Sequence, residues 1–99
     1  MQSISAIIRV KPGQETVMRD ALLAVAEHVR SEEPETLGFF VSQGNEDPCV
    51  FTTYERFADK AAMDRHNVSK AVADFFAIAG PILDGTVTLV IAGEVSASS

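Results

Sequence analysis

Four short segments of the chain have the pattern of strands: apolar and polar positions alternate most clearly in the first, and the last is rich in β-branched residues. These segments are Ser3–Val10, Leu37–Gln43, Cys49–Arg56 and Thr86–Ala92. A period of two residues is typical of strands that bury one face, so we expect four strands. The five residues from Gly44 to Pro48 form a turn cluster between the second and third segments. A loop of that length predicts an antiparallel hairpin.

Three other segments carry apolar residues at the three- and four-residue spacing of a helix. They are Gln14–Arg30, Lys60–His66 and Lys70–Ala79. Pro12-Gly13 supplies a turn before the first helix, and Pro34 follows its end. Asp59 and Ser69 precede the second and third helices and are suited to cap them.

The predicted order is strand, helix, strand, strand, helix pair, strand. Two such halves with right-handed crossovers give an α+β fold, a ferredoxin-like four-stranded antiparallel sheet with helices on one face. With 99 residues the chain is long enough for one core. We expect a single domain over residues 1–95 and a frayed tail over residues 96–99.

Helices can cover only one face of such a sheet. The alternation predicts that the uncovered face carries Ile7, Val41, Val50, Thr52 and Tyr54. A face this apolar is expected to be buried against a partner. The simplest partner is a second copy of the chain, which predicts a homodimer through the open sheet face that bears Tyr54.

Composition removes several classes of partner. Eight basic and 14 acidic residues give a net charge of −6, which disfavours nucleic acids and anionic membranes. One cysteine precludes a disulfide within the chain, and two histidines are few for a zinc site. The sequence shows no targeting or membrane-spanning segment and no nucleotide-binding glycine motif. We therefore expect a cytoplasmic protein without a metal or cofactor.

Four stretches of the chain carry a family resemblance: RVKPG, EEPETLGFF, YERFADKAAMDRH and VADFF. With Pro12-Gly13, Tyr54-Glu55, Asp59 and His66 at these spacings, the chain resembles the antibiotic biosynthesis monooxygenase (ABM) domain family from Ile4 to Leu89. The resemblance implies a dimeric α+β barrel with its pocket between the sheet and the helices. Relatives include cofactor-independent oxygenases, quinol monooxygenases, haem-degrading enzymes and isomerases.

The chain departs from the family at several site positions. Polyketide-oxidising relatives have an amide, a Trp and a Tyr where this chain has Thr53, Phe57 and Met63. Haem-degrading relatives have a ligand histidine at the position of Phe75 or Phe76, and phenylalanine cannot bind iron. Compared with the pocket of the polyketide-oxidising relatives, the pocket of this chain is therefore expected to be more apolar. The resemblance also argues against haem degradation.

The strand alternation predicts which side chains face the helices and so line the pocket. The predicted substrate-binding residues are Phe40, Ser42, Phe51, Thr53, Phe57, Met63, Phe75 and Phe76. Cys49 and Glu55 share the inward face of the third strand. The alternative interpretation is that the phenylalanines are simply the hydrophobic core.

His66 is the predicted catalytic residue, because an imidazole on the inward face of a helix can take a proton near neutral pH. Its alternative role is to hydrogen-bond the turn at Asn67-Val68. His28 lies one turn from the end of the first helix, where it is expected to act as a capping cation.

Four further predictions concern polar or reactive side chains. Tyr54 is expected at the dimer interface, and Cys49 is expected to behave as a small apolar residue. Glu55 needs a partner, for which Arg9, Arg56 or a backbone amide are candidates. Glu32, Glu33 and Glu35 are expected to form a solvated acidic loop.

Three functions remain open from the sequence. The first is a cofactor-independent monooxygenase that oxidises an aromatic polyketide-like or quinol-like molecule with O₂, with His66 as the base. The second is an isomerase or cyclase on the same scaffold. The third is a non-catalytic dimeric module that binds an apolar small molecule.

Overall fold

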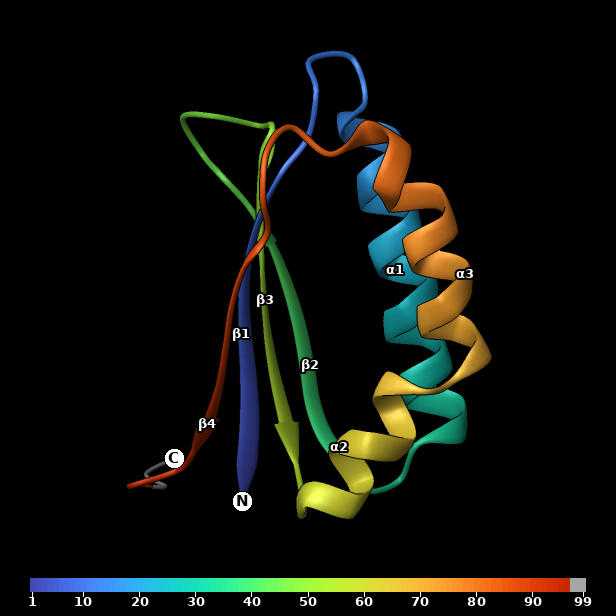
Figure 1. Ribbon diagram of the computed structural model, residues 1–99, viewed down its shortest axis with the longest axis vertical. Coiled ribbons are helices and arrows are strands. Elements are labelled where there is room, and N and C mark those ends of the chain that lie inside the picture. Colours follow the sequence, from blue (N-terminus) through green and yellow to red (C-terminus); the bar gives the residue numbers. More distant parts are fainter. Residues whose placement is uncertain (97–99) are drawn as a thin grey trace.

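The computed structural model describes residues 1–96, and its elements follow the predicted order (Figure 1). They are β1 (Gln2–Arg9), α1 (Glu15–Glu32), β2 (Thr36–Gln43), β3 (Val50–Phe57), α2 (Lys60–Asn67), α3 (Lys70–Ala79), the short 3₁₀ helix η1 (Gly80–Ile82) and β4 (Thr88–Gly93). The strands form one antiparallel sheet in the order β2-β3-β1-β4. The predicted ferredoxin-like α+β fold is confirmed.

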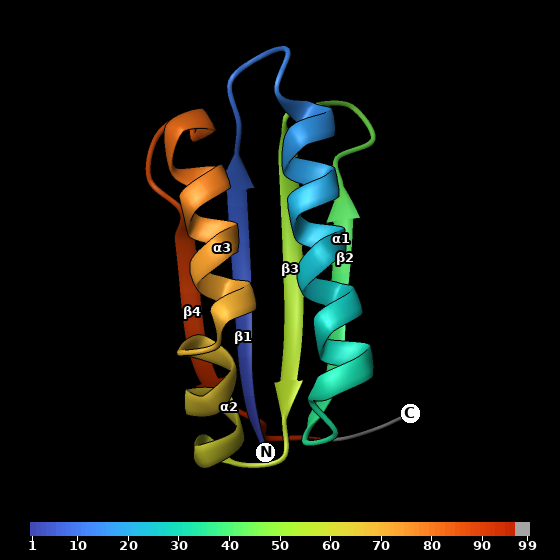
Figure 2. The same cartoon turned by 90° about the vertical axis from the view of Figure 1, so that its right-hand side faces the viewer.

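All the helices lie on one face of the sheet. Figure 2 shows α1 in front of β2 and β3, and α3 in front of β1 and β4. The core between these layers is built around four fully buried side chains, those of Val10, Met18, Phe51 and Phe57. The inward positions of β1 and β3 are the ones that the alternation predicts.

The predicted helix caps are confirmed. The Asp59 carboxylate accepts a hydrogen bond from the backbone N–H of Ala62 (2.8 Å), and the Ser69 hydroxyl accepts one from Val72 (3.3 Å). Such bonds satisfy N–H groups that lack partners in the first turn of a helix. They fix where α2 and α3 begin, and α2 carries His66.

β2 contains an irregularity that the sequence does not reveal. Thr36 pairs with Phe57, but Gly38 pairs with the adjacent Arg56, so Leu37 is an extra residue on β2. A one-residue bulge reverses the face on which every later side chain lies.

The predicted orientation of β2 is therefore wrong. Phe40 and Ser42 lie on the open face of the sheet, opposite Tyr54 and Thr52, rather than toward the helices. Val41, which the alternation places on the open face, packs against the main core. Phe39 also points toward the helices.

The open face carries a row of exposed apolar side chains, which includes Ile7, Phe40, Tyr54 and Val90. The rings of Phe40 and Tyr54 stack, with centroids 6.4 Å apart and planes inclined by 17°. Gly38 makes room for this arrangement, because a Cβ atom there would come within 2.7 Å of the Phe40 ring.

Two further sequence predictions concern the C-terminal tail and membrane-spanning segments. Apart from Ser96, the predicted tail over residues 96–99 lies outside the described residues. Within residues 1–96, no helix has both the length and the apolar character needed to cross a bilayer.

Candidate functional site

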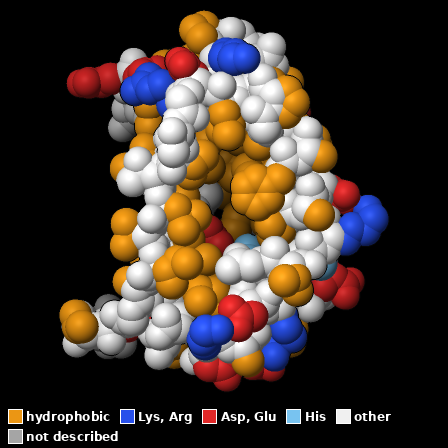
Figure 3. All heavy atoms as spheres, viewed as in Figure 1, with side chains coloured by type: hydrophobic (Ala, Val, Ile, Leu, Met, Phe, Trp, Pro, Cys, Tyr) orange, Lys and Arg blue, Asp and Glu red, His pale blue; other side chains and the backbone are white. Residues whose placement is uncertain are grey.

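A cavity of about 280 Å³ lies between the sheet and the helices. Its volume is near the lower end of the roughly 300–1,000 Å³ typical of small-molecule sites. Most of its lining is aliphatic or aromatic, and the exceptions are Thr53, Glu55, His66 and Asn67. Figure 3 shows a hollow with hydrophobic walls and with acidic and histidine side chains at its base. The cavity therefore has apolar walls and one polar end.

The mouth of the cavity lies between α3 and the edge strand β4. Phe76 on α3 and Leu89 and Ile91 on β4 line the cavity, yet each is more than half exposed. Leu89 and Ile91 pair with Ala6 and Ile4 of β1, so they lie on the helix-facing side of the sheet. A flat ligand entering here would meet apolar side chains on both sides.

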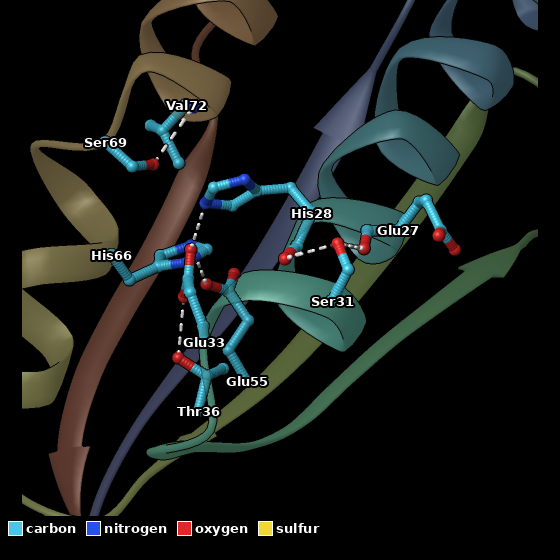
Figure 4. Close-up of polar contacts among 9 residues, drawn as sticks. All are labelled: Glu27, His28, Ser31, Glu33, Thr36, Glu55, His66, Ser69 and Val72. Atoms are coloured by element: carbon cyan, nitrogen blue, oxygen red, sulfur yellow. Dashed lines mark hydrogen bonds and ion pairs between the residues drawn. The ribbon is translucent and has the colours of Figure 1, made fainter.

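His66 occupies the polar end and is 3% exposed. Its Nδ1 atom lies 2.8 Å from Oε1 of Glu33, and its Nε2 atom lies 3.3 Å from Oε1 of Glu55 (Figure 4). A carboxylate can only accept a hydrogen bond, so Nδ1 carries the hydrogen shared with Glu33. The imidazole is thus held between two acidic side chains from different elements.

The elements around His66 restrict the position of its ring. His66 lies in the last turn of α2, and its ring packs between Phe39 (centroids 5.7 Å apart) and Phe57 (5.3 Å). Glu55 comes from β3 and accepts a hydrogen bond of 2.8 Å from the hydroxyl of Thr53.

Glu33 is placed by the end of α1. Its backbone N–H bonds to the carbonyl of Val29 at 3.1 Å, which closes the helix. The Thr36 hydroxyl donates to Oε1 of Glu33 at 2.7 Å, so this oxygen accepts from both Thr36 and His66. The turn between α1 and β2 therefore orients the carboxylate toward α2.

The other oxygen of Glu33 faces His28. Nε2 of His28 lies 2.9 Å from Oε2 of Glu33, a close contact that lacks hydrogen-bond geometry. Both residues border a second hollow of about 330 Å³ on the outside of the molecule. Glu33 thus lies between the inner cavity's histidine and this outer hollow.

The two carboxylates change the acidity of His66. Burial disfavours its charged form and is the largest single influence, but the hydrogen bonds and charges of Glu55 and Glu33 act together in the other direction. Their combined effect raises the pKa of His66 above its ordinary value. His66 is therefore a stronger base than a free histidine.

The structure brings together only part of the predicted site. His66, Thr53, Phe75 and Phe76 line the cavity. Phe51, Phe57 and Met63 do not line it and are buried in the hydrophobic core, as the alternative interpretation of the phenylalanines anticipates. Phe40 and Ser42 lie on the opposite face of the sheet.

The sequence does not indicate that Glu33 and Glu55 are the partners of the histidines. The expected solvated loop is wrong for Glu33, whose side chain is only 13% exposed. The candidate partners of Glu55 are wrong as well, because Arg9 pairs with Asp47 and Arg56 with Glu94. The contacts of Glu33 and Glu55 with His66 join residues that are distant in the chain, so no local pattern in the sequence marks them.

Two other predictions can be compared with the structure. His28 faces Glu33 in addition to lying near the end of α1. Burial, followed by the neighbouring Glu15 carboxylate, raises the pKa of the Cys49 thiol, and Cys49 packs against the main core. Cys49 therefore behaves as a small apolar residue.

Within residues 1–96, no three His, Cys, Asp or Glu side chains are grouped to hold a metal ion.

Comparisons with known proteins agree with this architecture. The family model described as antibiotic biosynthesis monooxygenase (ABM) matches residues 1–78. No curated protein sequence matches the chain.

Solved structures share this fold over nearly the whole chain. A structure of an antibiotic biosynthesis monooxygenase has 22% sequence identity and a TM-score of 0.88 over 97% of this chain and 100% of its own. A Caulobacter crescentus protein described as a putative antibiotic biosynthesis monooxygenase has 20% identity and a TM-score of 0.89 over 96% of this chain and 90% of its own. A Mycobacterium tuberculosis protein has 18% identity and a TM-score of 0.90 over 99% and 98%. At these identities the structures support the fold alone.

Proposed function

Because the chain belongs to the antibiotic biosynthesis monooxygenase family, we propose that it is a cofactor-independent monooxygenase that oxidises an aromatic polyketide-like or quinol-like molecule with O₂. The family supports a general monooxygenase-like role. One observation carries the finer proposal: a buried histidine with two carboxylate partners lies at the polar end of an otherwise apolar cavity.

The ligand itself supplies the electrons in such a reaction. Loss of a proton turns a phenol, anthrone or dihydroquinone into an electron-rich anion that can reduce O₂. In an anthrone, a CH₂ group becomes a carbonyl; one oxygen atom enters the product and the other leaves as water. The protein has to remove the proton and exclude bulk water.

His66 is the proposed catalytic base. In its neutral form Nδ1–H bonds to Glu33, which leaves Nε2 on the side of the cavity and Glu55. Both carboxylates stabilise the imidazolium that forms when Nε2 takes the ligand's proton. Thr53 holds Glu55 in place through its hydroxyl.

The charges at the polar end favour neutral ligands. Two carboxylates outnumber the single imidazole, so a ligand carboxylate, sulfonate or phosphate there would face repulsion. A flat ring system with one hydroxyl or activated C–H group fits the site better. The walls contributed by Phe39, Phe75 and Phe76 are suited to stack on it.

A second candidate is an isomerase or cyclase on the same scaffold. The observation that favours it is that His66, Glu33 and Glu55 can move a proton without any need for oxygen. Turnover that is unchanged under anaerobic conditions would distinguish this activity from an oxygenase.

The proposal includes a homodimer through the open sheet face. The exposed side chains of Ile7, Phe40, Tyr54 and Val90 form an apolar row across all four strands on the side away from the helices. Two copies of the chain can pack this same face against each other about a two-fold axis.

The test is oxygen consumption by the metal-free protein with anthrones, naphthols and dihydroquinones. We expect uptake with at least one class, and loss of that uptake in His66→Gln, which keeps a polar side chain of similar reach. A thermal shift with the same compounds reports binding separately. Binding without uptake or other turnover supports a non-catalytic module, and normal uptake in His66→Gln removes His66 from the mechanism.

A further inference from the structure

Both histidines of the chain belong to one row of side chains that runs from the inner cavity to the outside of the molecule. The row begins at Glu55 and continues through His66 and Glu33 to His28, with successive contacts of 3.3, 2.8 and 2.9 Å. Figure 4 shows these four residues in that sequence, contributed by β3, α2 and the end of α1. From His66 outward the exposed fraction of the side chain rises, from 3% at His66 through 13% at Glu33 to 30% at His28.

We propose that this row is a proton path, in which Glu33 transfers protons between His66 and His28, and His28 exchanges them with water in the outer hollow. Glu33 is suited to this because His66 contacts its Oε1 atom and His28 contacts its Oε2 atom. A carboxyl group that takes a proton on one side can rotate about its Cγ–Cδ bond and present that proton on the other side. Glu33 and His28 are positioning and transfer groups, and neither lines the inner cavity.

Each transfer conserves charge and protons. An imidazolium at His66 gives its Nδ1 proton to Oε1 of Glu33, which leaves a neutral imidazole and a carboxylic acid. Rotation of the carboxyl group about its Cγ–Cδ bond then turns this O–H toward His28 and delivers the proton to Nε2 of His28. His28 then releases a proton to water or buffer. Small reorientation of the His28 ring is required, because its contact with Oε2 lacks hydrogen-bond geometry.

The path matters when a ligand fills the cavity. The mouth between α3 and β4 is then closed to water, and His66 is otherwise buried. A path on the Nδ1 side lets the imidazolium lose its Nδ1 proton without release of the ligand, which leaves a neutral ring with its hydrogen on Nε2. When Nε2 then gives that hydrogen to the reduced oxygen, Nδ1 takes a proton back from Glu33 and the Nδ1–H form is restored. This use in turnover rests on the proposed function, whereas the path itself does not.

Several charged side chains surround the outer hollow, where the proposed path meets water. Glu32, Glu35 and Arg65 border the hollow with His28 and Glu33, and Arg65 pairs with Glu35 at 3.0 Å. The remaining acidic side chain, Glu32, is exposed and belongs to none of the contacts in the row. Glu32 therefore offers a matched position at which to remove a nearby negative charge.

The decisive experiment measures how fast the Nδ1 proton of His66 exchanges with water, by NMR on ¹⁵N-histidine-labelled protein without ligand. The variant is His28→Gln, whose amide can still donate to Glu33 but cannot pass a proton on. We expect exchange to slow by about tenfold or more in this variant and to recover when imidazole is added. Glu32→Gln should exchange like the wild type.

Each outcome of this experiment decides the proposal. Equal exchange in wild type and His28→Gln would overturn it, and so would slowing that imidazole does not restore, since that pattern indicates a structural role. Thermal unfolding of His28→Gln checks that the fold is retained. The result does not depend on turnover, so absence of oxygen uptake would count against the proposed function and leave the proton path standing.

Discussion

The Nδ1 atom of His66 lies 2.8 Å from Oε1 of Glu33, although 33 positions separate the two residues in the chain. This contact joins the end of α1 to the last turn of α2 at the polar end of the cavity. It gives the buried imidazole a hydrogen-bond acceptor, and together with Glu55 it raises the pKa of His66 against the opposing effect of burial.

Removal of Glu33 should destabilise the protein. In Glu33→Ala the buried imidazole of His66 loses its acceptor, and Thr36 loses one as well. We expect the free energy of unfolding in urea to fall by about 2–4 kcal/mol. Glu32→Ala, an exposed neighbour on the same helix, is the control and should stay within about 0.5 kcal/mol of the wild type. A loss in Glu33→Ala no larger than in this control would contradict the structural role of the contact.

The contribution of His66 to stability should depend on pH. Its pKa is raised in the folded protein, so folding favours the protonated ring. The stabilisation is therefore complete below about pH 6.5, the ordinary pKa of an unfolded histidine, and is lost as pH rises through the raised value. Urea unfolding of wild type and His66→Gln from pH 5.5 to 9 measures this. The stability difference should shrink as pH increases, and a difference that grows with pH would be inconsistent with the raised pKa.

Phe76 should contribute to ligand binding with little effect on folding. It lines the mouth of the cavity and is 59% exposed, so its ring is available to stack on a flat ligand. We expect Phe76→Ala to weaken binding of an aromatic ligand such as a naphthol by roughly 3–10-fold, which corresponds to about 0.5–1.5 kcal/mol. Ile78→Ala is the control, because Ile78 is also exposed on α3 but does not line the cavity. Equal effects of the two substitutions in calorimetric titrations would argue against binding at this mouth.

A charge on the open sheet face should prevent dimer formation. Phe40 on the edge strand β2 stacks on Tyr54 of the apolar row, so Phe40→Glu would place a carboxylate in the proposed interface. Light scattering after size exclusion should give a dimer for the wild type and a monomer for this variant. Leu23→Glu changes an equally apolar, exposed residue on α1 and should remain dimeric. A monomeric wild type would overturn the proposed homodimer.

Much of the fold was predictable because its signals are local. Alternation along β1 and β3, and capping by Asp59 and Ser69, each depend on residues within a few positions of one another. These signals set the element order, and the order limits the topology. The prediction that His66 lies on the inward face of its helix follows from the same local spacing.

The errors arose where structure depends on distant residues. Pairing with β3 reveals the extra residue in β2, and nothing in the apolar and polar pattern around Leu37 marks it. The run Glu32, Glu33 and Glu35 predicts a solvated acidic loop, and only the tertiary fold brings His66 of α2 to Glu33. Contacts of this kind carry no periodic signal.

The bulge in β2 decides which of two identical neighbours, Phe39 and Phe40, faces the helices and which faces the open side of the sheet. Phe39 borders the cavity beside His66, while Phe40 stacks on Tyr54 on the far side of the sheet. Gain or loss of a single residue at Leu37 in a descendant of this chain would exchange the two phenylalanines and disturb ligand and partner surfaces at once. Substitutions can adjust either surface separately, but the length of this strand is constrained by both.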